Sequence, residues 1–264
     1  MVFFCSDAVS ADPRAILFDL FGTLVFFDDS RLPRMEVSGR SVIMTVRSLP
    51  DLLRQACPAT SVTAFLTALQ EIGAELAEVK RRTCVEILTH VRFERALLCQ
   101  GADPGVAARV ARAMALEHMH SLAGAVVCPN DRVQVLRRLA GRFRLGLLSN
   151  FDDGPTARGI LDEYDLAPHF DTIVISADAG LRKPSRELFE QACRQMSMEP
   201  ADCLYVGDTW REDIEGATSA GLSAVWITSQ DVAEPPALGR IADVGELAGW
   251  VEERWPSAQG AARS

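Results

Sequence analysis

The most constraining feature of this chain is a repeated alternation between short apolar runs and helix-like segments. Three of the runs end in polar residues: Ala-Ile-Leu-Phe-Asp at 15–19, Leu-Gly-Leu-Leu-Ser-Asn at 145–150 and Cys-Leu-Tyr-Val-Gly-Asp at 203–208. Apolar runs of this length are typical of strands in a parallel sheet covered by helices. Two more apolar runs, 172–176 and 224–228, fit the same sheet as strands. Four segments between the runs have the length of crossover helices: 131–140, 157–164, 186–195 and 214–220. The sequence therefore predicts an α/β fold built on a parallel sheet.

Residues 29–125 interrupt this alternation with apolar positions at helical spacing. Val62, Phe65, Leu69 and Leu76 fall on one face of a helix, and no strand is evident in this stretch. We therefore expect a Rossmann-like core made of residues 14–28 and 126–250, into which an all-helical cap, residues 29–125, is inserted. Residues 256–264 are expected to form a flexible tail.

The charge is unevenly distributed along the chain. Overall, 27 Lys and Arg against 36 Asp and Glu give a net charge of −9. An acidic balance of this size argues against nucleic acid or an anionic membrane as partner. Between residues 30 and 124, however, 12 basic residues against 9 acidic ones give +3, and the remainder carries 15 against 27, or −12. The basic insert either has solvated helix faces or attracts an anionic substrate into a cleft beside the core.

Seven cysteines are scattered along the chain and never form a Cys-x-x-Cys pair. This distribution favours reduced thiols over a disulfide framework or a zinc site. The first residues show no export signal, and no uncharged apolar run approaches the ~20 residues that span a bilayer. We expect a cytoplasmic protein, a monomer or homodimer, that acts on a small anionic metabolite.

Polar residues at the predicted strand ends are the first candidates for a functional site, because ligands of open α/β sheets bind there. They are Asp19, Ser149 with Asn150, Lys183 in the Gly-Leu-Arg-Lys-Pro segment, and Asp208 with Asp213. Together they provide a carboxylate nucleophile, a hydroxyl and an amide for oxyanion oxygens, an ammonium group, and carboxylates for Mg²⁺. This combination is suited to a phosphate-handling site.

These segments, in this order, resemble the four motifs of the haloacid dehalogenase (HAD) superfamily of hydrolases, and the insert lies where that superfamily places its first-type, helical cap. The resemblance implies that Asp19 is the nucleophile of an aspartyl intermediate, that Ser149 binds the transferring group and that Lys183 offsets charge. It also implies a Mg²⁺ ion held by the carboxylates of Asp19 and Asp208 and the backbone carbonyl of Phe21, with Asp213 in its first or second shell. Gly22, Thr23 and Asn150 are predicted to bind substrate.

Phe21 departs from the phosphatases of this superfamily, which normally have a second aspartate at that position. That aspartate protonates the leaving alkoxide and later activates water, and such assistance is typically worth ~10²–10⁴ in rate. An aromatic residue there is instead a feature of the 2-haloacid dehalogenases, in which the nucleophile attacks carbon. Those enzymes, however, have an uncharged residue where this chain has Asp208, and a tyrosine where it has Phe189.

Three functional hypotheses follow. The favoured one is a Mg²⁺-dependent phosphatase that acts on a small phosphorylated metabolite through Asp19. The second is a dehalogenase-like hydrolase that acts at carbon, and it is motivated by Phe21. The third is a phosphate-sensing or partner-binding module without turnover, because an aspartyl phosphate at Asp19 would have no neighbouring base to activate water.

Overall fold

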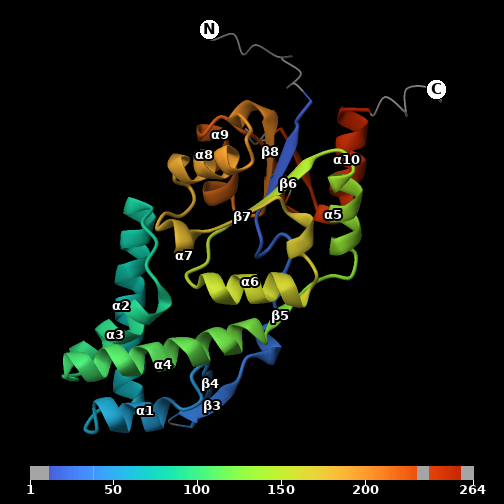
Figure 1. The fold of residues 1–264 in the computed structure, drawn as a ribbon. Coiled ribbons are helices and arrows are strands. Elements are labelled where there is room, and N and C mark those ends of the chain that lie inside the picture. Colours follow the sequence, from blue (N-terminus) through green and yellow to red (C-terminus); the bar gives the residue numbers. More distant parts are fainter. Residues whose placement is uncertain (1–11, 38, 231–237, 257–264) are drawn as a thin grey trace.

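The computed structural model describes residues 12–37, 39–230 and 238–256, and Figure 1 shows a larger part that contains the main sheet and a smaller, mostly helical part. The larger part is built on a six-stranded sheet in the order β10-β9-β8-β1-β6-β7, with every pair of neighbours parallel. Its strands are β1 (Ala15–Phe18), β6 (Arg144–Ser149), β7 (Thr172–Ile175), β8 (Cys203–Gly207), β9 (Ser223–Ile227) and β10 (Gly239–Ile241). The prediction of a parallel-sheet core is confirmed, and β10 is an edge strand that the sequence reading did not include.

Helices cover both faces of this sheet. They are α5 (Arg132–Ala140), α6 (Gly154–Glu163), α7 (Ser176–Ala179), α8 (Arg186–Gln195), α9 (Gly216–Ser219) and α10 (Leu247–Arg254). On β1, Ile16 and Phe18 pack with residues of α5, α6 and α10, whereas Ala15 and Leu17 pack with residues of α8 and α9. Both faces of β1 are therefore buried, which explains its uninterrupted apolar sequence.

The register of the sheet brings the predicted site residues to one edge. Phe18 lies opposite Leu147 of β6 and Val206 of β8. Asp19 follows Phe18 directly, while Ser149 ends β6 and Asp208 follows β8. Because parallel strands end at the same edge of a sheet, these side chains reach a common region.

The chain leaves the core at β2 (Phe26–Phe27) and returns at β5 (Val126–Val127), which pair antiparallel. Between them lie α1 (Leu49–Ala56), α2 (Val62–Thr83), α3 (Thr89–Cys99) and α4 (Pro104–Ala123). These helices enclose a core of their own that includes Phe65, Ile72, Phe93 and Met114. Figure 1 shows this second part beside and below the sheet, with α2 reaching toward α7. We call it the cap.

The cap was expected to be all-helical, and this is wrong because it also contains a β-hairpin. Residues Arg34–Val37 (β3) and Arg40–Ile43 (β4) form an antiparallel hairpin, with Gly39 at a φ of +76° in the turn. Met35, Val37 and Val42 pack against the cap core, whereas intervening residues face solvent. This two-residue alternation spans only four residues per strand, so the helical periodicity of the longer segments concealed it.

Two smaller differences concern the C-terminal half. Residues 214–220, predicted as one crossover helix, are instead the end of a π-helical segment, Trp210–Glu215, followed by the short helix α9. The tail predicted at 256–264 lies outside the described residues except for Pro256. Within the described part of the chain, no helix is both long and apolar enough to span a membrane.

Candidate active site

The centre of the site is a buried lysine between two carboxylates. Nζ of Lys183 lies 2.6 Å from Oδ1 of Asp19 and 2.6 Å from Oδ1 of Asp213, and it donates a third hydrogen bond to the hydroxyl of Tyr205 at 2.8 Å. Lys183 and Asp213 are 2% and 1% exposed. A buried charge of either sign is costly without a partner, so these three ionic groups stabilise one another in place.

Asn150 fixes the backbone that carries this lysine. Its Oδ1 accepts a hydrogen bond from the Lys183 amide at 2.8 Å, and its Nδ2 donates to the Lys183 carbonyl at 3.1 Å and to Oε2 of Glu212 at 2.8 Å. The side-chain amide that the sequence suggested for substrate binding is thus engaged with the protein. In this arrangement Asn150 positions Lys183.

Three carboxylates meet at the strand ends. Asp19, Asp208 and Asp213 each offer an oxygen, and these oxygens lie within 4.8 Å of one another. Gly22, with a φ of +89°, passes so close to Asp208 that a Cβ there would lie 2.3 Å from its Oδ2. A side chain at position 22 would therefore displace Asp208, and the glycine keeps the cluster compact.

The electrostatics of this cluster favour a cation. Burial is the main cause that raises the pKa of Asp19 to about 7, against the lowering effect of Lys183, and it also raises the pKa of Asp208. Burial by itself would lower the pKa of Lys183, but Asp19 and Asp213 outweigh it and raise that pKa. Hard oxygen ligands of this kind are those that Mg²⁺ prefers, and a divalent cation would relieve the repulsion between the carboxylates. The residues present therefore fit a magnesium site.

Two hydroxyl groups at the site have no hydrogen-bond partner among the residues that the structure describes. They are Ser149 Oγ and Thr23 Oγ1, which are buried, with residue exposures of 0% and 1%. Buried polar groups are normally paired, so an unpaired hydroxyl at a strand end indicates a ligand that completes it. Both residues were predicted to bind the transferring group or the substrate, and their placement suits oxyanion oxygens.

Phe21 lies in an aromatic stack. Its ring centroid is 4.9 Å from that of Phe27 and 4.7 Å from that of Phe151. The Phe21 side chain is thus apolar and can neither donate nor accept a proton. The phenylalanine that replaces the usual second aspartate packs against two other aromatic rings of the fold.

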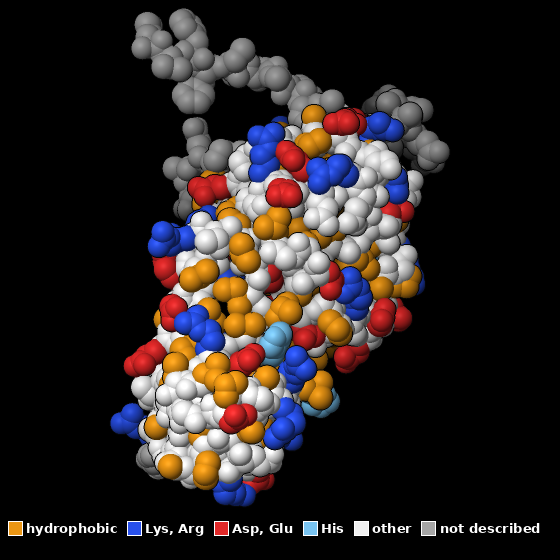
Figure 2. All heavy atoms as spheres, turned by 60° about the vertical axis from the view of Figure 1, so that its left-hand side comes forward, with side chains coloured by type: hydrophobic (Ala, Val, Ile, Leu, Met, Phe, Trp, Pro, Cys, Tyr) orange, Lys and Arg blue, Asp and Glu red, His pale blue; other side chains and the backbone are white. Residues whose placement is uncertain are grey.

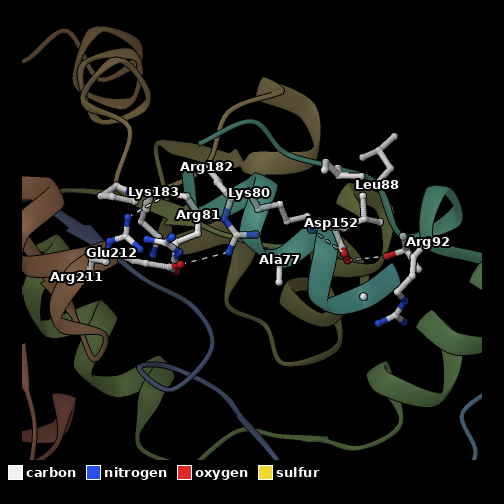
Figure 3. A pocket seen from close by; sticks show the side chains of 15 residues that line it. Ala77, Lys80, Arg81, Leu88, Arg92, Asp152, Arg182, Lys183, Arg211 and Glu212 are labelled. Carbon is white, nitrogen blue, oxygen red and sulfur yellow. Dashed lines mark hydrogen bonds and ion pairs between the residues drawn. The ribbon is translucent and has the colours of Figure 1, made fainter. Parts of the chain in front are cut away.

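A cavity of about 370 Å³ opens between the cap and the loops of the core that carry Asp152, Lys183 and Glu212, and Figure 3 shows the side chains around it. Its lining includes Lys183 and Glu212 from the core and residues of α2 and α3 from the cap. Cap and core meet here directly: Asp152 Oδ1 accepts a hydrogen bond from Thr89 Oγ1 at 2.6 Å, and its Oδ2 lies 3.3 Å from Lys80 Nζ. Figure 2, which brings the α2 side forward, shows basic and acidic side chains interspersed on that face.

The sequence reading missed several residues of this site. Tyr205 and Glu212 hold Lys183 and Asn150, and Arg92 lines the cavity from α3. Tyr205 could have been found from the sequence, because it places a hydroxyl group within the otherwise apolar run at 203–208. Arg92 could not, because its place in the cavity depends on how the cap packs against the core.

Comparison with known proteins identifies the family. A family model described as haloacid dehalogenase-like hydrolase matches residues 13–221. Glyceraldehyde 3-phosphate phosphatase of Methanothermobacter thermautotrophicus is 27% identical over 219 residues, which cover 82% of this chain and 86% of that protein. N-acylneuraminate-9-phosphatase of Mus musculus is 35% identical over 113 residues, 42% of each chain.

The fold is also found among solved structures. The 2-haloacid dehalogenase from Pseudomonas syringae pv. Tomato DC3000 superimposes with a TM-score of 0.68 at 24% sequence identity, and the match covers 92% of this chain and 99% of that one. The likeness thus extends over the sheet and the cap. With the family model matched over most of its length, the chain belongs to the haloacid dehalogenase-like hydrolases.

Proposed function

We propose that this hydrolase is a Mg²⁺-dependent phosphatase that acts on a small phosphorylated metabolite, with Asp19 as its nucleophile. The observation that carries the proposal is the cluster of Asp19, Asp208 and Asp213, whose oxygens lie within 4.8 Å of one another beside Lys183. Three crowded carboxylates cost free energy unless a cation balances them, and a reaction that needs no cation gives no reason to keep Asp208. The phosphatase relatives support the same substrate class.

The residues act on the phosphoryl group in two steps. An Asp19 oxygen attacks phosphorus while the bond to the ester oxygen breaks, and the departing oxygen takes a proton from water because Phe21 supplies none. Water then hydrolyses the aspartyl phosphate, which releases phosphate and restores Asp19. Lys183 and the unpaired hydroxyls of Ser149 and Thr23 stabilise the phosphoryl oxygens. Asp19, Asp208 and the Phe21 carbonyl, with Asp213 nearby, would hold a Mg²⁺ ion, which would supply charge neutralisation.

Hydrolysis at carbon is the second candidate, and the aromatic stack at Phe21 favours it. A halide leaves without a proton, so an apolar side chain beside the nucleophile is no disadvantage in that reaction. The buried carboxylate cluster is the feature that this alternative leaves without a purpose.

A paired screen distinguishes the two reactions. Phosphate release from an aryl phosphate and halide release from chloro- and bromoalkanoates are each measured with Mg²⁺ and with EDTA. The phosphatase proposal predicts phosphate release that needs Mg²⁺ and is lost in Asp19→Asn, while Asp162→Asn, an exposed carboxylate on α6, keeps the activity. Halide release that persists in EDTA, without phosphate release, would overturn it in favour of the dehalogenase-like reaction.

A further inference from the structure

The cavity beside the active site is lined by six basic side chains, and four of them have carboxylate partners. Lys80 pairs with Glu86 and Asp152, Arg81 with Glu78, Arg182 with Glu86 and Glu212, and Lys183 with Asp19 and Asp213. For Arg92 and Arg211, no carboxylate of the described residues lies within ion-pair distance. The six partner carboxylates equal the six basic side chains in number, so Arg92 and Arg211 are distinguished by position and not by an excess of positive charge.

These two arginines differ in their surroundings. Arg211 is exposed, and its Nη2 donates to the backbone carbonyl of Arg81 at 3.1 Å, so solvent screens its charge. Arg92 projects from α3, and its Nε is buried without a hydrogen-bond partner. By contrast, the buried Arg132 of the core lies 2.9 Å from Asp131 and 2.7 Å from Asp243. The Nε of Arg132 is likewise buried without a hydrogen-bond partner, so the two arginines differ in their ion pairs: Arg132 has two carboxylates, and the half-buried Arg92 has none among the described residues.

The guanidinium of Arg92 is held in position by a neutral histidine. Because arginine only donates hydrogen bonds, His118 Nε2 is the acceptor for Nη2 of Arg92 at 3.4 Å, and its Nδ1 proton is directed to Thr45 Oγ1 at 2.7 Å. Gly73 of α2 faces the stem of Arg92, where an added Cβ would lie 3.6 Å from its Cδ. The guanidinium carbon also lies 5.2 Å from the centroid of the Phe93 ring, and Asp152 acts on its charge from beyond ion-pair distance. The cap thus orients this guanidinium without a direct ion pair.

We infer that Arg92 binds a carboxylate of the substrate, so that the phosphorylated metabolite is a phosphorylated carboxylic acid. This inference rests on the proposed phosphatase function and narrows it. Lys183 and Arg92 line the same cavity from the core and from the cap, and Figure 3 shows them at opposite ends of it. A carboxylate carries one negative charge, which balances one guanidinium, and its two oxygens match the planar fork of arginine. The scissile phosphate then lies at the Lys183 end, where the lysine contacts Asp19.

Matched pairs of esters test this inference. Phosphorylated straight-chain hydroxy acids of increasing length are compared, one by one, with the monophosphates of the diols of the same length. A hydrogen bond to a charged group contributes enough for a preference of about 10- to 100-fold in kcat/KM, and we expect this for the acid at the length that spans the cavity. Arg92→Gln is expected to bring that ratio near one, and Arg92→Lys to retain part of it.

Arg95→Gln is the matched control, because Arg95 lies on the same helix, is partly exposed and pairs with Glu75. It should keep the wild-type ratio. Calorimetry on Asp19→Asn, which binds without turnover, should show the same preference as a ratio of Kd values, and that preference should be lost in Asp19→Asn/Arg92→Gln. Equal use of acid and diol at every length, or equal ratios in Arg92→Gln and Arg95→Gln, would overturn the inference and leave the phosphatase proposal intact. Absence of phosphate release from every ester would instead overturn the proposed function.

Discussion

Nζ of Lys183 lies 2.6 Å from Oδ1 of Asp213, and both side chains are almost fully buried. Asp19 shares the same ammonium group. Removing the lysine therefore leaves two buried carboxylates without a cation.

We predict that Lys183→Met lowers the free energy of unfolding by about 3–5 kcal/mol, the usual cost of breaking a buried ion pair by removing one partner. Urea unfolding without Mg²⁺ measures this effect. Arg186→Gln, which breaks an exposed pair with Glu190, should change the free energy by less than about 1 kcal/mol. Equal effects of the two substitutions would contradict the structural role given to Lys183.

Because the Ser149 hydroxyl has no partner among the described residues, we predict that its removal lowers the activity without lowering the stability. Ser149→Ala removes a buried polar group that has no partner, so the protein should be as stable as the wild type or gain up to about 1 kcal/mol. Phosphate release should fall by at least about tenfold, because a donor to the phosphoryl oxygens is lost.

Ser176→Ala is the contrasting variant. The Ser176 hydroxyl donates to Oε2 of Glu86 at 2.5 Å and accepts from the Phe151 amide at 2.9 Å. Its removal should cost about 1–3 kcal/mol in the same unfolding experiment. A Ser149→Ala variant that is destabilised as much as Ser176→Ala would show that Ser149 has a structural partner.

Phe21 sets the third prediction. Phe21→Asp places a carboxyl group where the chain has no acid or base, and we expect turnover of an alkyl phosphate to rise within the ~10²–10⁴ range typical of general acid–base catalysis. Phe21→Asn is the control, since it also breaks the stack with Phe27 and Phe151 but cannot transfer a proton. If neither the wild type nor either variant releases phosphate from an aryl or alkyl ester while each binds Mg²⁺, the chain is better described as a binding module without turnover.

His118 makes stability depend on pH. Burial, with a further contribution from Arg92, lowers its pKa from 6.5 to about 4, against the opposing effect of Asp152. The unfolded state thus binds a proton more readily than the folded state, so stability is fully present above pH 6.5 and is lost as the pH falls toward 4. The loss approaches about 1.4 kcal/mol per pH unit within this window.

Unfolding free energies of the wild type and His118→Gln, measured between pH 4 and 7, test this prediction. The variant should lack the contribution of His118, so its stability should fall less steeply with decreasing pH. His120→Gln, an exposed histidine of the same helix, should follow the wild-type curve. Parallel curves for the wild type and His118→Gln would show that His118 titrates equally in both states.

The sequence predicted those parts of the molecule in which neighbouring residues carry the signal. Asp19, Ser149 and Asp208 were recognisable because each ends an apolar run, and strands of a parallel sheet end together. The hairpin β3–β4 was missed because its two-residue alternation is short. Edge strand β10 has only three residues, Gly239–Ile241, which provide too little pattern for an assignment.

Contacts between segments that are distant in the chain could not be predicted from the sequence. Arg92 and His118 come from different helices and meet only when α3 packs against α4. Asn150 was expected to face the substrate because it ends a strand, but the loop that carries Lys183 satisfies its amide. Local pattern predicted which residues reach the edge of the sheet, and packing decided what each one binds.

The central claim, that Asp19 is phosphorylated during turnover, can be tested by trapping the intermediate. Trypsin cleavage after Arg14 and Arg31 yields one peptide that contains Asp19. After an acid quench of wild-type protein with Mg²⁺ and an aryl phosphate, mass spectrometry should find one phosphoryl group on this peptide, at Asp19. The group should be absent without Mg²⁺ and in Asp19→Asn. Phosphate release by the wild type without this label, or a label that persists in Asp19→Asn, would contradict the account.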